Sequence, residues 1–130
     1  MTATLRILRW LPAAAQAALI FALSAQPDLR LADEPLLDFI LHKAGHLAVY
    51  AILAALIAWA LDVPGATRSR TWTFAVVACL VYAATDELHQ GFVPGRHSTP
   101  VDVAIDMFGA LLGLAAYAWV TRNRVFRTPV

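Results

Sequence analysis

Residues 103–120 read VAIDMFGALLGLAAYAWV, a run in which Asp106 is the sole charged residue. Such a run is typical of a helix that crosses lipid, which needs about 20 mostly apolar residues. Three further apolar runs precede it, from about Leu11 to Ala25, from His46 to Leu61 and from Trp72 to Thr85. We therefore expect an all-α fold, an integral membrane four-helix bundle.

The composition of the whole chain agrees with this expectation. Of its 130 residues, 60% are apolar and 15% are charged, whereas an ordinary soluble domain has about 25% charged residues. So few polar side chains cannot cover a soluble domain of this size, and disordered chains contain fewer apolar residues. We expect one domain over residues 1–130, with helices at about 7–25, 36–61, 71–88 and 101–121.

Short polar segments separate the predicted helices. Asp33-Glu34-Pro35 has the composition of a helix start, with acids in the first turn and proline near the first helical position. Pro64-Gly65 and Pro94-Gly95 predict turns. The lone cysteine, Cys79, excludes an intramolecular disulfide and is expected to be buried. The net charge of +1 comes without a basic stripe, so nucleic acid is not an expected partner.

Most basic residues fall on one side of the predicted bundle. Seven of the ten flank it or lie in the loop between its second and third helices: Arg6, Arg9, Arg68, Arg70, Arg122, Arg124 and Arg127. The positive-inside rule then places both termini in the cytoplasm, for a multi-pass protein of the bacterial inner or plasma membrane. The first run also fits a cleaved signal peptide, with small residues near Ala25. Cleavage would leave three helices and an external N-terminus.

The acids and histidines gather in the other half of the predicted bundle. All four histidines and eight of the nine acids belong to it, and Asp62 is the exception. Charges near hydrocarbon cost free energy unless they pair or line a wet cavity. The asymmetry therefore predicts a polar site in the outer half, at the membrane–water interface.

Helical spacing groups the candidate residues on three helix faces. The second helix presents Lys43, His46 and Tyr50, the third presents Asp86 and Gln90, and the fourth presents Asp102, Asp106, Gly109 and Gly113. The Gly-x-x-x-Gly spacing lets another helix approach closely. We expect Asp106 to point into the bundle and the three faces to converge.

Four motifs together resemble the VanZ-like family. They are Ser24-Ala25-Gln26-Pro27, Lys43-x-x-His46-x-x-x-Tyr50, Asp86-Glu87-x-x-Gln90-x-Phe92-x-Pro94-Gly95-Arg96 and Asp102-x-x-x-Asp106-x-x-Gly109-x-x-x-Gly113. The resemblance covers about residues 20–115. It implies a small membrane protein of the bacterial cell envelope. The founding member of that family is associated with resistance to the glycopeptide teicoplanin.

Two functions fit these residues. In the first, Lys43 and Arg96 neutralise an anionic envelope lipid, a lipid-linked phosphate or a cell-wall precursor. Tyr50, Gln90, Asp102 and Asp106 complete that binding site, and His46, Asp86 and Glu87 are candidates for acid–base catalysis. In the second, the protein is a non-enzymatic accessory or transport-like oligomer that associates through Gly109 and Gly113, and the polar cluster is structural. Whether the chain is an enzyme stays open.

Some of these residues also have structural interpretations. Glu87 and Arg96 could form a buried ion pair. Thr99-Pro100-Val101-Asp102 has the form of a capping box for the fourth helix. The Tyr50 hydroxyl is expected to bond to a neighbouring helix.

Histidine in an apolar helix raises the question of a metal ion. His42 and His46 have the spacing H-x-x-x-H, but Lys43 stands where zinc proteases have glutamate. His46 could still ligate a metal across helices with Asp86, Glu87 or His89, or instead bond to Tyr50 or a carboxylate. We expect no metal and no cofactor, and His97 is expected to be a solvated loop residue.

Overall fold

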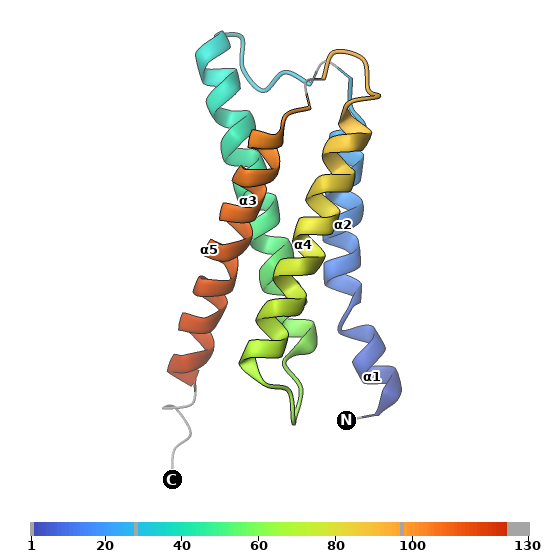
Figure 1. The fold of residues 1–130 in the computed structure, drawn as a ribbon, viewed down its shortest axis with the longest axis vertical. Helices are drawn as coiled ribbons and strands as arrows, with labels where there is room; N and C mark the ends of the chain where they lie inside the picture. Colours follow the sequence, from blue (N-terminus) through green and yellow to red (C-terminus); the bar gives the residue numbers. More distant parts are fainter. Residues whose placement is uncertain (1, 28, 97, 125–130) are drawn as a thin grey trace.

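The structure, a computed structural model, describes residues 2–27, 29–96 and 98–124, with the backbone alone at 123 and 124. The described part is helical: α1 (Ala3–Leu8), α2 (Leu11–Ser24), α3 (Pro35–Leu61), α4 (Arg68–Gln90) and α5 (Pro100–Arg124). The long helices lie lengthwise in an elongated bundle, as Figure 1 shows. Asp28, one of the eight acids expected in the outer half, lies outside the described residues, as do His97 and Arg127.

The first predicted helix is two helices rather than one, so the expected single element at 7–25 is wrong. The helix is interrupted at Arg9 and Trp10, between α1 and α2. Pro12 explains the break, because it lacks an N–H and its ring would collide with the carbonyl four residues earlier, that of Leu8. Leu8 is the last residue of α1.

The other helix boundaries follow the sequence signals. Pro35 is the first residue of α3, and the Glu34 carboxylate caps that helix by accepting from the N–H groups of Leu36 and Leu37. The two predicted turns contain glycines in the left-handed region, with φ of 88° at Gly65 and 75° at Gly95.

Three helical segments within the described residues are long and apolar enough to cross a membrane. They are Ala3–Ser24, counted as one, Pro35–Leu61 and Pro100–Arg122. Four apolar spans were expected, and three are found in that part of the chain; the helix that falls short is α4. Helix α4 has 23 residues, but Arg68 and Arg70 at one end and Asp86 and Glu87 at the other lower its apolar character.

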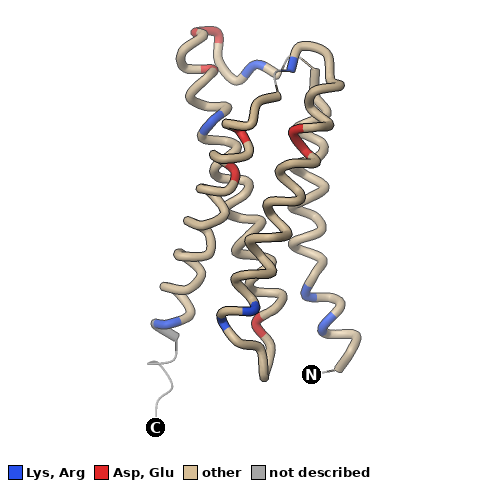
Figure 2. Tube along the Cα trace, in the orientation of Figure 1, with Lys and Arg blue, Asp and Glu red and all other residues tan. Residues whose placement is uncertain are grey.

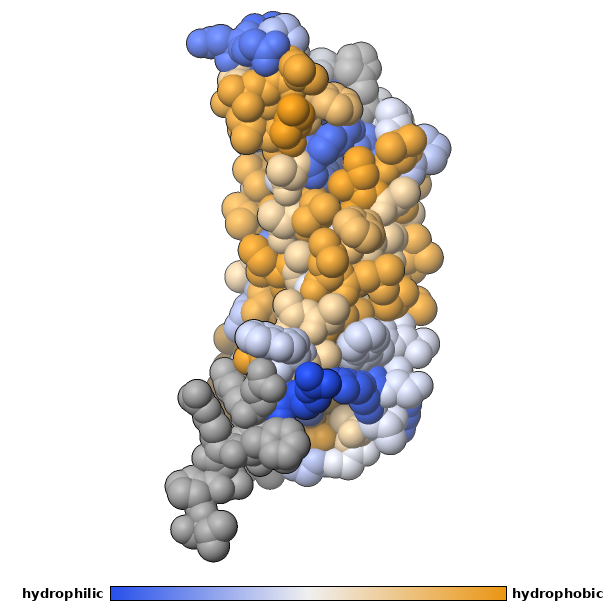
Figure 3. All heavy atoms as spheres, turned by 90° about the vertical axis from the view of Figure 1, so that its left-hand side faces the viewer, coloured by the Kyte–Doolittle hydropathy of each residue, from blue (hydrophilic) through white to orange (hydrophobic). Residues whose placement is uncertain are grey.

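Many large apolar side chains on the helices face outward instead of into the bundle. Phe21, Phe39, Phe74, Phe108 and Trp119 are each at least half exposed. Figure 3 shows the resulting apolar surface between two hydrophilic ends, with a hydrophilic patch within it near the upper end. A surface of this kind fits lipid contact, because a soluble monomer rarely exposes so large an apolar area.

The helices α3 and α5 make the most extensive contact in the bundle. A Cβ on Gly109 would lie against the backbone of Leu47, and one on Gly113 would lie against the backbone of Ala51. The two glycines therefore serve the predicted close helix contact inside the chain. Association of copies through the same glycines stays a prediction, and it would have to displace α3.

The charges are unevenly distributed along the bundle. Figure 2 shows acidic residues mainly toward the end where α4 leads into α5, while basic residues collect at the end that holds α1. At the basic end, Arg9 donates to the backbone oxygens of Trp59 and Asp62 and lies over the Trp59 ring, 4.5 Å from its centroid. Arg9 thereby attaches the segment between α1 and α2 to the last turn of α3.

Candidate functional site

Two adjoining cavities open near the acidic end of the bundle. The first, of about 360 Å³, is lined by Lys43, His46, Gln90, Arg96 and Asp102, among others. The second, of about 120 Å³, is more apolar and includes Ile20, Leu23, Leu31 and Val49 in its wall. Leu29, His42, His46 and Arg96 line both cavities. The polar and apolar spaces are therefore neighbours.

Asp86 anchors a hydrogen-bond network that joins α2 to α4. The Ser24 hydroxyl donates to Asp86 Oδ2 at 2.8 Å, and the Gln90 amide donates to the same oxygen at 3.0 Å. All three side chains are buried. Ser24 belonged to a motif in the sequence but was not among the predicted site residues. Its position in the last turn of a helix that has only one other polar residue, Gln16, is the signal that could have identified it.

Gln90 also separates Arg96 from the nearby acids. Arg96 NH2 donates to Gln90 Oε1 at 2.9 Å, while Gln90 Nε2 lies 3.4 Å from Glu87 Oε1. No ion pair joins Glu87 to Arg96, or Arg96 to any other carboxylate, among the described residues. The ion pair considered from the sequence is therefore wrong.

The start of α5 is tied to α4 through Thr99. Asp102 N–H donates to Thr99 Oγ1, as in a capping box. The Thr99 backbone N–H, however, donates to Glu87 Oε2 at 3.1 Å instead of to Asp102. Asp102 is thus free to accept from Lys43 Nζ in an ion pair and from the Thr99 hydroxyl. The predicted cap forms in part, and Glu87 supplies the rest.

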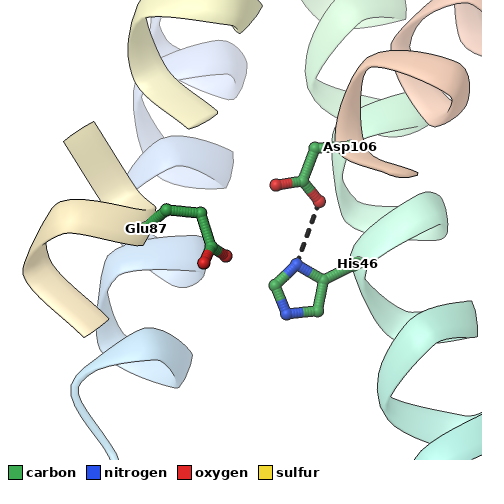
Figure 4. Close-up of side chains that lie close together, drawn as sticks. All are labelled: His46, Glu87 and Asp106. Carbon is green, nitrogen blue, oxygen red and sulfur yellow. Dashed lines mark hydrogen bonds and ion pairs between the residues drawn. The ribbon is translucent and has the colours of Figure 1, made fainter. Parts of the chain in front are cut away.

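His46, Glu87 and Asp106 approach one another from three different helices. Figure 4 shows these side chains pointing into the space between α3, α4 and α5. His46 Nδ1 and Asp106 Oδ1 are 2.9 Å apart, so of the two hydrogen-bond partners considered for His46, Tyr50 and a carboxylate, the structure has the carboxylate. One potential ligand atom from each residue lies within 4.8 Å of the others. The site therefore has a deep cluster behind its cavity.

Some buried polar atoms at this end have no hydrogen-bond partner among the described residues. They include Tyr50 Oη, Asp86 Oδ1 and Asp106 Oδ2. The expectation that the Tyr50 hydroxyl bonds to a neighbouring helix is therefore wrong, although the side chain is fully buried. Unpaired buried polar atoms cost free energy and call for an explanation, such as a ligand.

Every residue proposed for the site from the sequence lies at this end of the bundle. Lys43, Gln90 and Asp102 line the larger cavity, Tyr50 and Asp86 line the smaller one, and His46 and Arg96 line both. Glu87 and Asp106 lie behind them, almost completely buried. The three predicted helix faces do converge, with Ser24 and Thr99 as additional members of the network. The convergence establishes proximity, while the role of each residue stays a prediction.

The comparison with known proteins agrees with the resemblance described above. The family model described as VanZ/LLP1 matches residues 4–121, which include all five helices for most of their length. No curated protein and no solved structure gives a significant match to the chain. Because the family match covers far more than half of the sequence and includes every residue of the site, the chain belongs to the VanZ/LLP1 family.

Proposed function

We propose that the protein is a multi-pass membrane protein of the bacterial cell envelope that binds the anionic headgroup of an envelope lipid. Arg96 carries the proposal: its guanidinium lines the larger cavity and bonds to the neutral Gln90 amide, with no carboxylate partner among the described residues. A guanidinium of this kind matches phosphate through parallel N–H donors. The group expected in the cavity is therefore a phosphate.

The neighbouring cavity supports a lipid as the source of that phosphate. Its wall contains Ile20, Leu23, Leu31 and Val49, and it shares Arg96 with the polar cavity. A phospholipid or a polyprenyl phosphate has the same order of groups, an anionic head followed at once by hydrocarbon. Asp38 also lines the polar cavity, but the backbone N–H groups of Leu31 and Ala32 bind its Oδ1.

The arrangement of Asp86 and Glu87 favours binding of the headgroup over catalysis. Protein donors bind one oxygen of Asp86 and both oxygens of Glu87. A general base needs a carboxylate oxygen within reach of the proton that it takes. The roles of His46, Asp86 and Glu87 in acid–base chemistry remain a second proposal, for which a turnover assay on the bound lipid is the test.

The test compares lipid binding by wild type, Arg96→Ala and Arg96→Lys. The probes in native mass spectrometry are undecaprenyl phosphate, phosphatidylglycerol, zwitterionic phosphatidylcholine and inorganic phosphate. We expect Arg96→Ala to weaken binding of the anionic lipids by about 10- to 100-fold, since a charge-assisted hydrogen bond contributes about 1.5–3 kcal/mol. The affinity of Arg96→Lys should fall between those of wild type and Arg96→Ala, because lysine keeps the charge but lacks the planar, bidentate donor geometry of arginine.

Arg122→Ala is the matched control, since Arg122 is exposed near the opposite end of the bundle, in α5. Equal affinities of wild type and Arg96→Ala for every anionic probe would refute the proposed site. Preference for inorganic phosphate over both lipids would assign the site to a free anion.

A role in teicoplanin tolerance is the finer part of the proposal. A protein that holds an envelope lipid at the outer face of the cell membrane acts where glycopeptides bind their targets. Expression of wild type in a susceptible host should then raise the teicoplanin concentration that inhibits growth. Arg96→Ala, at the same membrane abundance, should not.

A further inference from the structure

We propose that His46, Glu87 and Asp106 together bind a divalent transition-metal ion in the interior of the bundle. The inference stands apart from the headgroup proposal, because Glu87 and Asp106 do not line either cavity and its test needs no lipid. It begins with the convergence of one imidazole and two carboxylates from three helices, with one ligand atom of each within 4.8 Å of the others.

The donor set fits such an ion. Imidazole nitrogen and carboxylate oxygen are common protein ligands of zinc, and imidazole with carboxylate also suits manganese and iron. Ligand atoms around a tetrahedral zinc ion lie about 3.3 Å apart, given bond lengths of about 2.0–2.1 Å. The ligand atoms lie within 4.8 Å of one another, so rotations of the side chains would be needed to bring them to that separation.

An unpartnered atom is the second, independent observation. Asp106 is completely buried, its Oδ1 bonds to His46, and its Oδ2 has no partner among the described residues. Figure 4 shows the second oxygen of this carboxylate directed toward the side of the gap from which Glu87 extends. A buried carboxylate oxygen without a donor calls for a proton or a cation beside it.

The charge balance favours the cation. Four carboxylates are at least 95% buried at this end, those of Asp86, Glu87, Asp102 and Asp106. Lys43 neutralises Asp102, and His46, which is charged only when protonated, is paired with Asp106. No lysine or arginine pairs with Asp86, Glu87 or Asp106 among the described residues. One divalent ion held by neutral His46, Glu87 and Asp106 offsets two of these negative charges.

Three protein ligands leave a fourth coordination position. Sites of that form are usually those at which water or a substrate atom reaches the metal, whereas purely structural zinc sites use four protein ligands. His46 lines both cavities, so the position adjoins the space already described. The open position makes this a binding site for a small oxygen ligand as well as for the metal.

The first experiment measures metal binding by the full chain after removal of any affinity tag and of bound metal with a chelator. Zinc is titrated by calorimetry, and bound metal is counted by elemental analysis. We expect one zinc per chain for wild type, and affinity lower by more than about tenfold for His46→Gln, Glu87→Gln and Asp106→Asn. Asp62→Asn is the matched control, because Asp62 follows α3 at the opposite end.

Cobalt supplies a measurement that needs no variant. Co²⁺ bound by one nitrogen and several oxygens in a low-symmetry site gives a visible absorption band, which zinc should displace at one equivalent. Absence of saturable zinc and cobalt binding by wild type would overturn the proposal. Stoichiometric binding that persists in Glu87→Gln and Asp106→Asn would overturn it too, since it would place the metal on other residues, such as His42 or His89.

Discussion

Gln90 uses both ends of its amide to hold the polar end of the bundle together. Its Nε2 donates to Asp86, and its Oε1 accepts from Arg96. The side chain is 2% exposed, so water does not replace these partners. An amide is suited to this position because it offers donors and an acceptor at once, whereas a carboxylate lacks the donors and leucine lacks both.

Gln90→Leu should therefore destabilise the protein by about 1–3 kcal/mol, the usual cost of leaving buried partners unsatisfied. Gln16→Leu is the matched control, because Gln16 is partly buried and makes one bond, to the Val49 carbonyl. Thermal unfolding followed by circular dichroism in one detergent compares the two variants. Equal losses of stability would contradict the central position of Gln90.

The residues that gather at the acidic end could be predicted from the sequence, except for Ser24, but most of their hydrogen-bond partners could not. Helical spacing placed His46 and Asp106 on inward faces, because the spacing fixes the direction of each side chain around its own axis. It does not fix the rotation of one helix against the next. The missing partner of the Tyr50 hydroxyl depended on that rotation. The donation from Arg96 to Gln90 instead of to Glu87 depended on the course of the loop after α4, because both acceptors lie on that helix.

At the scale of the element, the pairing of α3 with α5 rests on two glycines. At both positions an added Cβ would meet backbone of α3, which cannot rotate away as a side chain can. The two helices would have to separate, and Asp106, which lies on α5, would move away from His46.

Gly109→Ala and Gly113→Ala should each lower the free energy of unfolding by about 1–3 kcal/mol, as overpacked sites do. Gly45→Ala is the control, since an added Cβ there meets nothing within 4 Å. It should leave stability unchanged or raise it by up to about 1 kcal/mol through helix propensity. Thermal unfolding of the three variants tests this order, and a Gly113→Ala protein as stable as Gly45→Ala would be evidence against the close contact.

Helix positions followed from apolar runs and capping residues, with one exception. Glu34-Pro35 and the two Pro-Gly turns marked where α3 begins and where the loops lie. The break before α2 was missed because the predicted helix at 7–25 extended the apolar run, which begins at about Leu11, backward across Arg9 and Trp10. Pro12 carried the information, since a proline is compatible with a first turn but not with a helix interior.

For the whole molecule, the separation of charges along the long axis predicts an orientation. With its basic end toward the cytoplasm, the loop between α3 and α4 faces inward and the loop between α4 and α5 faces outward. The family match and the apolar helices agree with a membrane protein. Orientation cannot be read from the fold, because a bundle packs identically in either direction.

Cysteine labelling tests this orientation. Ser98→Cys should react with a membrane-impermeant maleimide in intact cells, while Ala66→Cys should react only after the membrane is permeabilised. Both positions are exposed. The native Cys79 is completely buried, so wild type serves as the unlabelled control. Labelling of Ala66→Cys but not of Ser98→Cys in intact cells would show that the protein has the opposite orientation.

The bond from the Thr99 N–H to Glu87 has a consequence for the dynamics of the loop between α4 and α5. An amide held in this way exchanges its hydrogen with solvent slowly, and release of the carboxylate frees it. Any ligand that attracts Glu87 Oε2 competes with the Thr99 N–H, just before α5, for the same oxygen. Binding of a ligand by Glu87 and fraying of the start of α5 are therefore linked equilibria. The hydrogen-exchange rate of the Thr99 amide reports both.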